Sequence, residues 1–199
     1  MDTVPQDSPQ AIPQAVSALR GGHVIAAPTE TVYGLMALWR SDSARQEIYR
    51  LKHRPADKRL QMLAPDIDTA IHAGLKPNTM LRKIAAAFWP GPLTVIVEAT
   101  NGDTIGLRIP NHPFVLKLLR ELGEPLAATS ANLSGTSAAV TPSDAVAHLD
   151  GRPALLIDGG VVSVTGGASS TVVSIVGGDL KILRQGPVTL EDIQAVLDG

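Results

Sequence analysis

The sequence predicts an α/β or α+β domain, in which helices pack on a mixed parallel and antiparallel sheet. Short apolar runs suited to strands interleave with segments of helical spacing along the 199 residues. At least two neighbouring strand pairs have no helix between them, so the sheet is expected to be mixed rather than purely parallel. A chain of this length fits one domain and is long enough to bury a core.

The first part of the chain predicts two helices and two strands. Residues 12–20 place apolar side chains at helical spacing, and two glycines end that helix. Residues 23–29 (HVIAAPT) are typical of a buried strand. Residues 41–52 begin with a serine that can cap a helix and carry apolar side chains on one face. Residues 60–63 (LQML) predict a short strand.

The middle of the chain predicts a hairpin between two helices. Residues 77–89 form the first helix, which a Pro-Gly-Pro sequence ends. Strands are expected at residues 93–100 and 104–110, because an Asn-Gly turn lies between these two apolar runs. Residues 112–123 predict the second helix, with glycine at its end.

The last third predicts strands joined by short polar segments. Residues 125–131 form a strand that runs into a loop of small residues at 132–139, and residues 142–149 form a short helix. Three strands and a final helix complete the domain, at residues 154–160, 170–176, 180–186 and 189–197.

Composition excludes several classes of site. The chain has no cysteine, which excludes disulfides, thiolate nucleophiles and cysteine zinc sites. It has no Gly-Lys dipeptide and therefore no Walker A loop, and no Ser lies in a G-x-S-x-G elbow. The net charge of −2 argues against a globally basic nucleic-acid coat, so any anion site must be local.

The sequence also bears on location. No apolar run approaches the roughly 20 residues that span a bilayer. The first ten residues are acidic and polar, without the basic flank and apolar core of a signal peptide. We therefore expect a cytoplasmic protein, with a polar and flexible leader at residues 1–10 and a single domain at residues 11–199.

The most unusual stretch is LKHRPADKRLQ (51–61), which holds four of the 17 Lys and Arg residues. If the chain is extended there, Lys52 and Arg54 point the same way. Two such cations suit a polyphosphate, since arginine adds a bidentate fork and lysine a point charge. Lys58 and Arg59 follow the turn. A solvated basic loop is the alternative, although the proline restrains the loop and lowers the entropy lost on binding.

Other polar side chains gather at strand ends. In PTETVYGL (28–35), the hydroxyls of Thr29 and Thr31 can bind a small polar ligand or cap a local turn. Arg108 lies in an otherwise apolar strand, where a charge is costly unless it is paired or faces a ligand. A structural salt bridge and a binding role both remain open for it.

Two further clusters complete the pattern. ATSANLSG (128–135) places Ser130 and Asn132 directly after an apolar strand, where they can hold phosphate or ribose oxygens or satisfy their own turn. Ser170 begins a strand, and Arg184 ends one. Together these strand-end residues indicate one site for an anionic ligand.

Six motifs in this order resemble a known family: PTETVYGL, KHRPADK, WPGPLTVIV, LRIPNHP, TSANLSG and STVV…ILRQG. The chain resembles the YrdC/TsaC-type L-threonylcarbamoyladenylate synthases, in their short single-domain branch, over roughly residues 12–187. The resemblance implies a twisted mixed sheet with a large electropositive cavity. It also implies a nucleotidyltransferase that condenses L-threonine, bicarbonate and ATP to threonylcarbamoyl-AMP and pyrophosphate, for the t6A modification of tRNA.

The resemblance assigns roles to individual residues, with Lys52 and Arg54 as the catalytic cations. Contacts to ATP are implied for Lys52, Arg54, Lys58, Thr104, Ser130, Asn132 and Arg184. Contacts to L-threonine are implied for Thr31, Arg108, Asn132 and Ser170. Mg²⁺ is expected with ATP, held mainly by the phosphates and water rather than by a protein metal site. The resemblance also implies transfer partners of the TsaD/TsaB/TsaE type and a weak contact to tRNA. No association with a membrane is expected.

The sequence departs from the family pattern at two positions. Arg59 replaces a common proline and Leu63 replaces a histidine, so any substrate contact from that histidine is missing. We assign no functional role to Arg59 or to His53. Two alternatives remain open: an RNA-binding module without catalysis, and a paralogue that makes another acyl-adenylate.

Overall fold

The structure, a computed structural model, describes residues 1–162 and 168–199. The strands are β1 (Asp2–Pro5), β2 (Ile25–Pro28), β3 (Tyr33–Leu38), β4 (Gln61–Leu63), β5 (Leu93–Glu98), β6 (Thr104–Arg108), β7 (Leu126–Ser130), β8 (Leu155–Asp158), β9 (Thr171–Ser174) and β10 (Lys181–Arg184). The helices are α1 (Ala11–Arg20), α2 (Asp42–Lys52), α3 (Ile67–His72), α4 (Thr79–Phe88), α5 (Pro113–Leu122), α6 (Asp144–Ala147), α7 (Leu190–Asp198) and the 3-10 helix η1 (Val176–Gly178).

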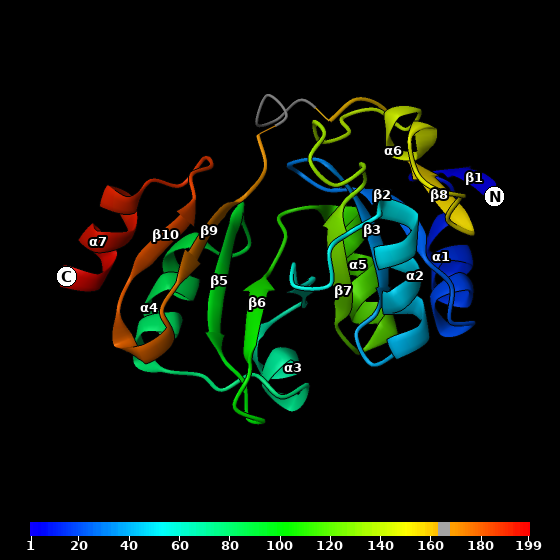
Figure 1. The fold of residues 1–199 in the computed structure, drawn as a ribbon. Helices are drawn as coiled ribbons and strands as arrows, with labels where there is room; N and C mark the ends of the chain where they lie inside the picture. Colours follow the sequence, from blue (N-terminus) through cyan, green and yellow to red (C-terminus); the bar gives the residue numbers. More distant parts are fainter. Residues whose placement is uncertain (163–167) are drawn as a thin grey trace.

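The described strands form one ten-stranded sheet in the order β1-β8-β2-β3-β7-β4-β6-β5-β9-β10, with helices on its faces (Figure 1). Parallel pairs such as β5 with β9 occur beside antiparallel pairs such as β5 with β6. The predicted mixed sheet flanked by helices is therefore confirmed. In the part of the chain that the structure describes, no helix is both long and apolar enough to cross a membrane.

The N-terminal segment corrects one expectation. Asp2–Pro5 is not a flexible leader but the edge strand β1, which pairs in parallel with β8 from Asp2↔Leu155 to Pro5↔Asp158. Only Val4 of this strand is buried. A four-residue edge strand with one buried side chain shows too little alternation to be recognised in a polar sequence.

One half of the molecule is a three-layer structure. Helices α1 and α5 pack on one face of β2, β3 and β7, where Leu19 and Leu118 are fully buried. Helix α2 covers the opposite face, where Ile48 and Leu51 are fully buried. Because both faces of these strands are covered, they read as continuous apolar runs rather than as alternating sequences.

The other half leaves one face of its strands open. Helices α4 and α7 cover β5 and its neighbours on one side, where Val95 and Ile193 are fully buried. On the other side, Thr94 and Ile96 of β5 face a cavity. The three-residue strand β4 joins the halves, because it pairs with β7 on one side and β6 on the other. The candidate site lies at this junction.

Candidate active site

A cavity of about 280 Å³ lies over the junction between the two halves of the sheet. Side chains from β4, β5, β6, β7, β9 and β10 contribute to its lining. The structure brings seven of the residues predicted from sequence into this lining: Thr31, Arg54, Thr104, Arg108, Ser130, Ser170 and Arg184. Lys52, Lys58 and Asn132 are not part of it.

Arg108 is held at the cavity by three kinds of contact. Its Nη2 forms an ion pair with Oε1 of Glu30 at 2.7 Å, and its Nε donates to the carbonyl of Gly91 at 3.2 Å. Nη1 and Nη2 each donate to the hydroxyl of Thr31 at 3.1 Å. The side chain of Arg108 is only 3% exposed. The structural salt bridge and the cavity-lining position, left open by the sequence, are both present.

Thr29 and Thr31 have different roles: Thr29 caps a turn, and Thr31 lines the cavity. The hydroxyl of Thr29 donates to the carbonyl of Val32 at 2.7 Å and accepts from the amides of Thr31 and Val32. Thr29 therefore caps the turn after β2. The hydroxyl of Thr31 lies 2.9 Å from that of Thr29 and accepts from Arg108, which places it at the cavity.

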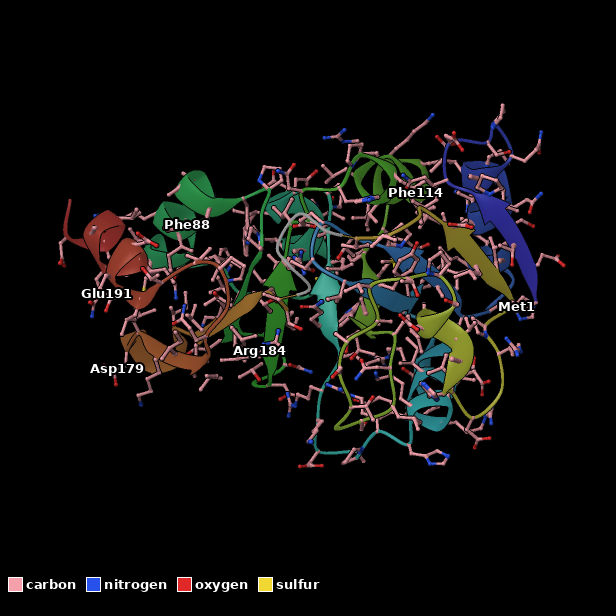
Figure 2. All side chains as sticks on the ribbon, turned by 90° about the horizontal axis from the view of Figure 1, so that it is seen from above. Met1, Phe88, Phe114, Asp179, Arg184 and Glu191 are labelled. Atoms are coloured by element: carbon pink, nitrogen blue, oxygen red, sulfur yellow. The ribbon has the colours of Figure 1, made fainter. Side chains whose placement is uncertain are left out.

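A line of polar contacts crosses the floor of the cavity. The hydroxyl of Thr94 donates to Oε1 of Gln61 at 2.9 Å and lies 3.0 Å from the hydroxyl of Ser170. Arg184 donates from Nε and Nη2 to the Ser170 carbonyl at 3.1 and 2.8 Å, and from Nη2 to its hydroxyl at 3.2 Å. Figure 2 shows Arg184 at the inner end of β10, beside the central strands. These contacts fix Ser170 and Arg184 relative to β5.

The basic stretch is shaped by the end of α2. His53 adopts a left-handed conformation with φ of 47°, which ends the helix and turns the chain. Its ring is paired with Asp150 and lies outside the cavity lining. Arg54 then donates from Nε to the carbonyl of Lys58 and from Nη2 to that of Arg59, both at 2.8 Å. These bonds orient the guanidinium in the cavity wall.

Lys52 is turned inward in this structure. Its side chain is buried, and Nζ donates to the backbone carbonyls of Ser130 and Asn132, with Oδ1 of Asn132 at 3.4 Å. Burial, and then the charge of Arg54, lower the pKa of Lys52 to about 8. Lys52 thus anchors the segment that follows β7 to the end of α2.

The side chain of Asn132 forms hydrogen bonds within its own loop. Its Nδ2 donates to the carbonyls of Leu133 and Thr136 at 2.8 and 2.9 Å, which is the local-turn arrangement that the sequence left open. Lys58 is exposed after the proline turn, and its carbonyl accepts from Arg54. Leu63, at the position of the missing family histidine, is buried in the core with Leu126.

The cavity gathers positive charge. Arg54, Arg59, Arg108 and Arg184 line it, and no carboxylate is among its described lining residues. Burial lowers the pKa of Arg184, and the charges of Arg108 and Arg54 lower it further. Mutual repulsion of this kind is relieved when an anion binds between the cations. The described residues contain no group of three or more His, Asp or Glu side chains arranged to hold a metal ion.

The lining also contains residues that the sequence did not assign to the site, among them Gln61, Thr94 and Arg59. Gln61 and Thr94 are uncharged and lie within strands, so only their alternation toward an open sheet face could have indicated them. Arg59 lines this cavity and also an adjoining cavity of about 590 Å³, although we had given it no role. Thr104 and Leu60 line both cavities as well.

Known proteins resemble this chain over most of its length. The Sua5/YciO/YrdC family model, described as "Telomere recombination", matches residues 17–186. The Bacillus subtilis (strain 168) protein named threonylcarbamoyl-AMP synthase is 41% identical over 211 residues, which cover 98% of this chain and 59% of that protein. The chain thus spans less than two thirds of that relative's length.

Two solved structures share the fold. The crystal structure of Pyrococcus abyssi Sua5 complexed with L-threonine has a TM-score of 0.89 at 31% identity, covering 98% of this chain and 60% of that chain. Escherichia coli YciO has a TM-score of 0.83 at 25% identity, covering 96% of this chain and 98% of that chain. On the family match, the sequence identity and the shared fold, this chain belongs to the Sua5/YciO/YrdC family.

Proposed function

We propose that the chain is an L-threonylcarbamoyladenylate synthase, which condenses L-threonine, bicarbonate and ATP to threonylcarbamoyl-AMP and pyrophosphate for t6A modification of tRNA. The observation that supports this most is the grouping of Arg54, Arg108 and Arg184 with serine and threonine hydroxyls in one cavity, with no carboxylate among its described lining residues. Similarity to the Bacillus protein named threonylcarbamoyl-AMP synthase and to the threonine-bound Sua5 structure supports the choice of substrate.

The chemistry requires no protein nucleophile. L-Threonine and bicarbonate give N-carboxythreonine and water. A carboxylate oxygen of the carbamate attacks the α-phosphorus of ATP, the bond from that phosphorus to the bridging oxygen breaks, and pyrophosphate leaves with the electron pair. The reaction is therefore a nucleotidyl transfer. The protein has to position the reactants and neutralise charge in a site that excludes water.

The residues divide between the two substrates. Arg54 and Arg184 are proposed to hold the phosphates, with the Ser130 and Thr104 hydroxyls beside the nucleotide. Arg108 is proposed to bind the threonine carboxylate. We further propose that Thr31 and Ser170 contact threonine. Lys52, Lys58 and Asn132 are proposed to contact ATP. Those last three lie outside the cavity lining, so their contacts require the basic stretch and the segment after β7 to close around the nucleotide.

The proposal extends to the metal and the partners. Bound with ATP, Mg²⁺ would neutralise phosphate charge. Since no carboxylate is among the described lining residues, phosphate and water oxygens are the expected Mg²⁺ ligands. The proposed contact of Asn132 with threonine also requires the segment after β7 to close around the substrates. We further propose a cytoplasmic protein that passes its product to partners of the TsaD/TsaB/TsaE type, with at most a weak contact to tRNA.

The deciding experiment follows pyrophosphate release from ATP and Mg²⁺ in the presence of L-threonine and bicarbonate. Release should stop when either threonine or bicarbonate is omitted. Release that another amino acid supports better than threonine would indicate a paralogue making a different acyl-adenylate. RNA binding with steep salt dependence, without threonine-dependent release, would indicate an RNA-binding module instead.

A further inference from the structure

Arg59 connects the basic stretch to the β5–β6 hairpin. Its Nη1 pairs with Oδ1 of Asp103 and donates to the backbone carbonyl and hydroxyl of Thr104 at 3.2 and 3.3 Å. The pairing lowers the pKa of Asp103. The Arg59 and Asp103 side chains are 57% and 48% exposed, so this connection lies at the surface. It joins two segments that are separate in the sequence, at a position where the family resemblance leads us to expect proline.

The main chain of Arg59 also contributes to the position of Arg54. Arg54 donates to the carbonyls of Lys58 and Arg59, both at 2.8 Å, and these bonds orient its guanidinium in the cavity wall. When the Arg59 side chain is tied to the hairpin, the carbonyls of Lys58 and Arg59, which precede and follow the Arg59 Cα, are held in place. The contacts to Asp103 and Thr104 therefore act on Arg54 through the backbone.

Arg59 also lies on a boundary. Together with Leu60 and Thr104 it lines both the reaction cavity of about 280 Å³ and the adjoining cavity of about 590 Å³. Its guanidinium donates a hydrogen bond to the hydroxyl of Thr104, which is proposed to lie beside the nucleotide.

We propose that Arg59 is a positioning residue for nucleotide binding, which acts by fixing the Arg54 guanidinium and the Thr104 hydroxyl at the boundary between the two cavities. This inference rests on the proposed function. Exposed ion pairs contribute little to global stability, so the loss of Arg59 should act on the basic stretch and not on the fold. Arg108 and Ser170, at the threonine end, are held by other contacts and should be unaffected.

The test compares Arg59→Ala and Arg59→Lys with a matched control, Arg40→Ala. Arg40 also forms a surface ion pair, with Glu124 at 2.7 Å, but is not among the lining residues of either cavity. Arg59→Ala should raise KM for ATP about tenfold, which corresponds to about 1.4 kcal/mol, while KM for threonine changes by less than about twofold. Arg59→Lys should recover part of this loss, because an ammonium can pair with Asp103 but lacks the guanidinium fork.

A second measurement does not depend on turnover. Amide hydrogen exchange of residues 54–60 should accelerate by about tenfold in Arg59→Ala and not in Arg40→Ala, because the tie to the hairpin is lost. Calorimetric affinity for a non-hydrolysable ATP analogue should fall in the same variant. Equal losses for ATP and threonine, unchanged ATP affinity and exchange, or the same effects in Arg40→Ala would overturn the proposal. Absence of threonine-dependent pyrophosphate release in the wild type would instead refute the proposed function, while exchange and analogue binding would still decide the role of Arg59.

Discussion

Arg108 and Glu30 form an ion pair beside the cavity, with 2.7 Å between Nη2 and Oε1 and side chains only 3% and 9% exposed. The same Oε1 accepts from the amide of Asn111 at 2.9 Å. Glu30 thereby ties the chain after β2 to the chain after β6. Because each charge is removed from water, the partner is needed to offset the cost of burying it. This pair is therefore part of the framework that positions Arg108.

Glu30→Gln should destabilise the fold strongly. The change leaves the Arg108 charge buried without its carboxylate, which typically costs about 3–5 kcal/mol. Urea unfolding of the variant and the wild type measures the loss. Glu124→Gln is the matched control, because it removes the carboxylate from the surface pair with Arg40 and should cost at most about 1 kcal/mol. Losses of equal size in the two variants would show that burial does not distinguish these pairs.

Arg54→Ala should lower turnover by roughly 10²- to 10³-fold, the effect of removing one preorganised group that stabilises transition-state charge. The melting temperature should change by less than about 4 °C, since the carbonyls that accept from Arg54 belong to its own exposed stretch. Steady-state pyrophosphate release and thermal unfolding measure the two quantities. Arg54→Lys keeps the charge without the fork and should give an intermediate rate. A collapse in melting temperature would make Arg54 structural.

Ser170→Ala should weaken threonine binding. Its hydroxyl lies 3.0 Å from that of Thr94 and 3.2 Å from Nη2 of Arg184, so it is held in the cavity. Loss of one hydrogen bond to substrate should raise KM for threonine by roughly two- to tenfold. Ser174→Ala changes the serine at the end of β9, which is not among the cavity-lining residues, and it should leave KM unchanged. Titration of pyrophosphate release against threonine gives both values, and equal KM values for the two variants would contradict this role.

Lys52 should make stability depend on pH. Its pKa is about 8 in the folded protein, well below the ordinary lysine value of 10.5. Between these values the unfolded chain binds a proton that the folded chain has released, so this group makes the free energy of unfolding rise with pH from about 8 to 10.5. Below pH 8 both states are protonated and the full cost of burying the charge applies.

Urea unfolding of the wild type and of Lys52→Met, compared from pH 7 to 10.5, isolates this contribution. The stability of the wild type relative to the variant should increase across the window. NMR titration of the Lys52 side chain gives the midpoint directly. A midpoint near 10.5, with a constant difference in stability, would show that the ammonium is not buried beside Arg54.

Local sequence patterns predicted most of the helices and strands. Ser41 caps α2 through its hydroxyl, and Gly123 ends α5 in a left-handed conformation, as the sequence signals indicated. Four elements were not predicted and have weak local signals, and one of them, η1, has only three residues. Strand β1 is a short edge strand, β3 is buried on both faces without alternation, and α3 has only six residues.

From the amino-acid sequence alone we could predict which hydroxyl-bearing and cationic residues lie at strand ends, and which family the motifs resemble. Which of these side chains contact one another depends on the tertiary fold. Thr31 and Arg108 are 77 residues apart and share a hydrogen bond because the loop between β2 and β3 reaches the end of β6, although three strands separate β2 from β6 in the sheet. The same packing turns Lys52 inward and places Arg59 at the boundary between the cavities. Local spacing encodes which face a side chain takes, whereas strand order depends on how the whole core is buried.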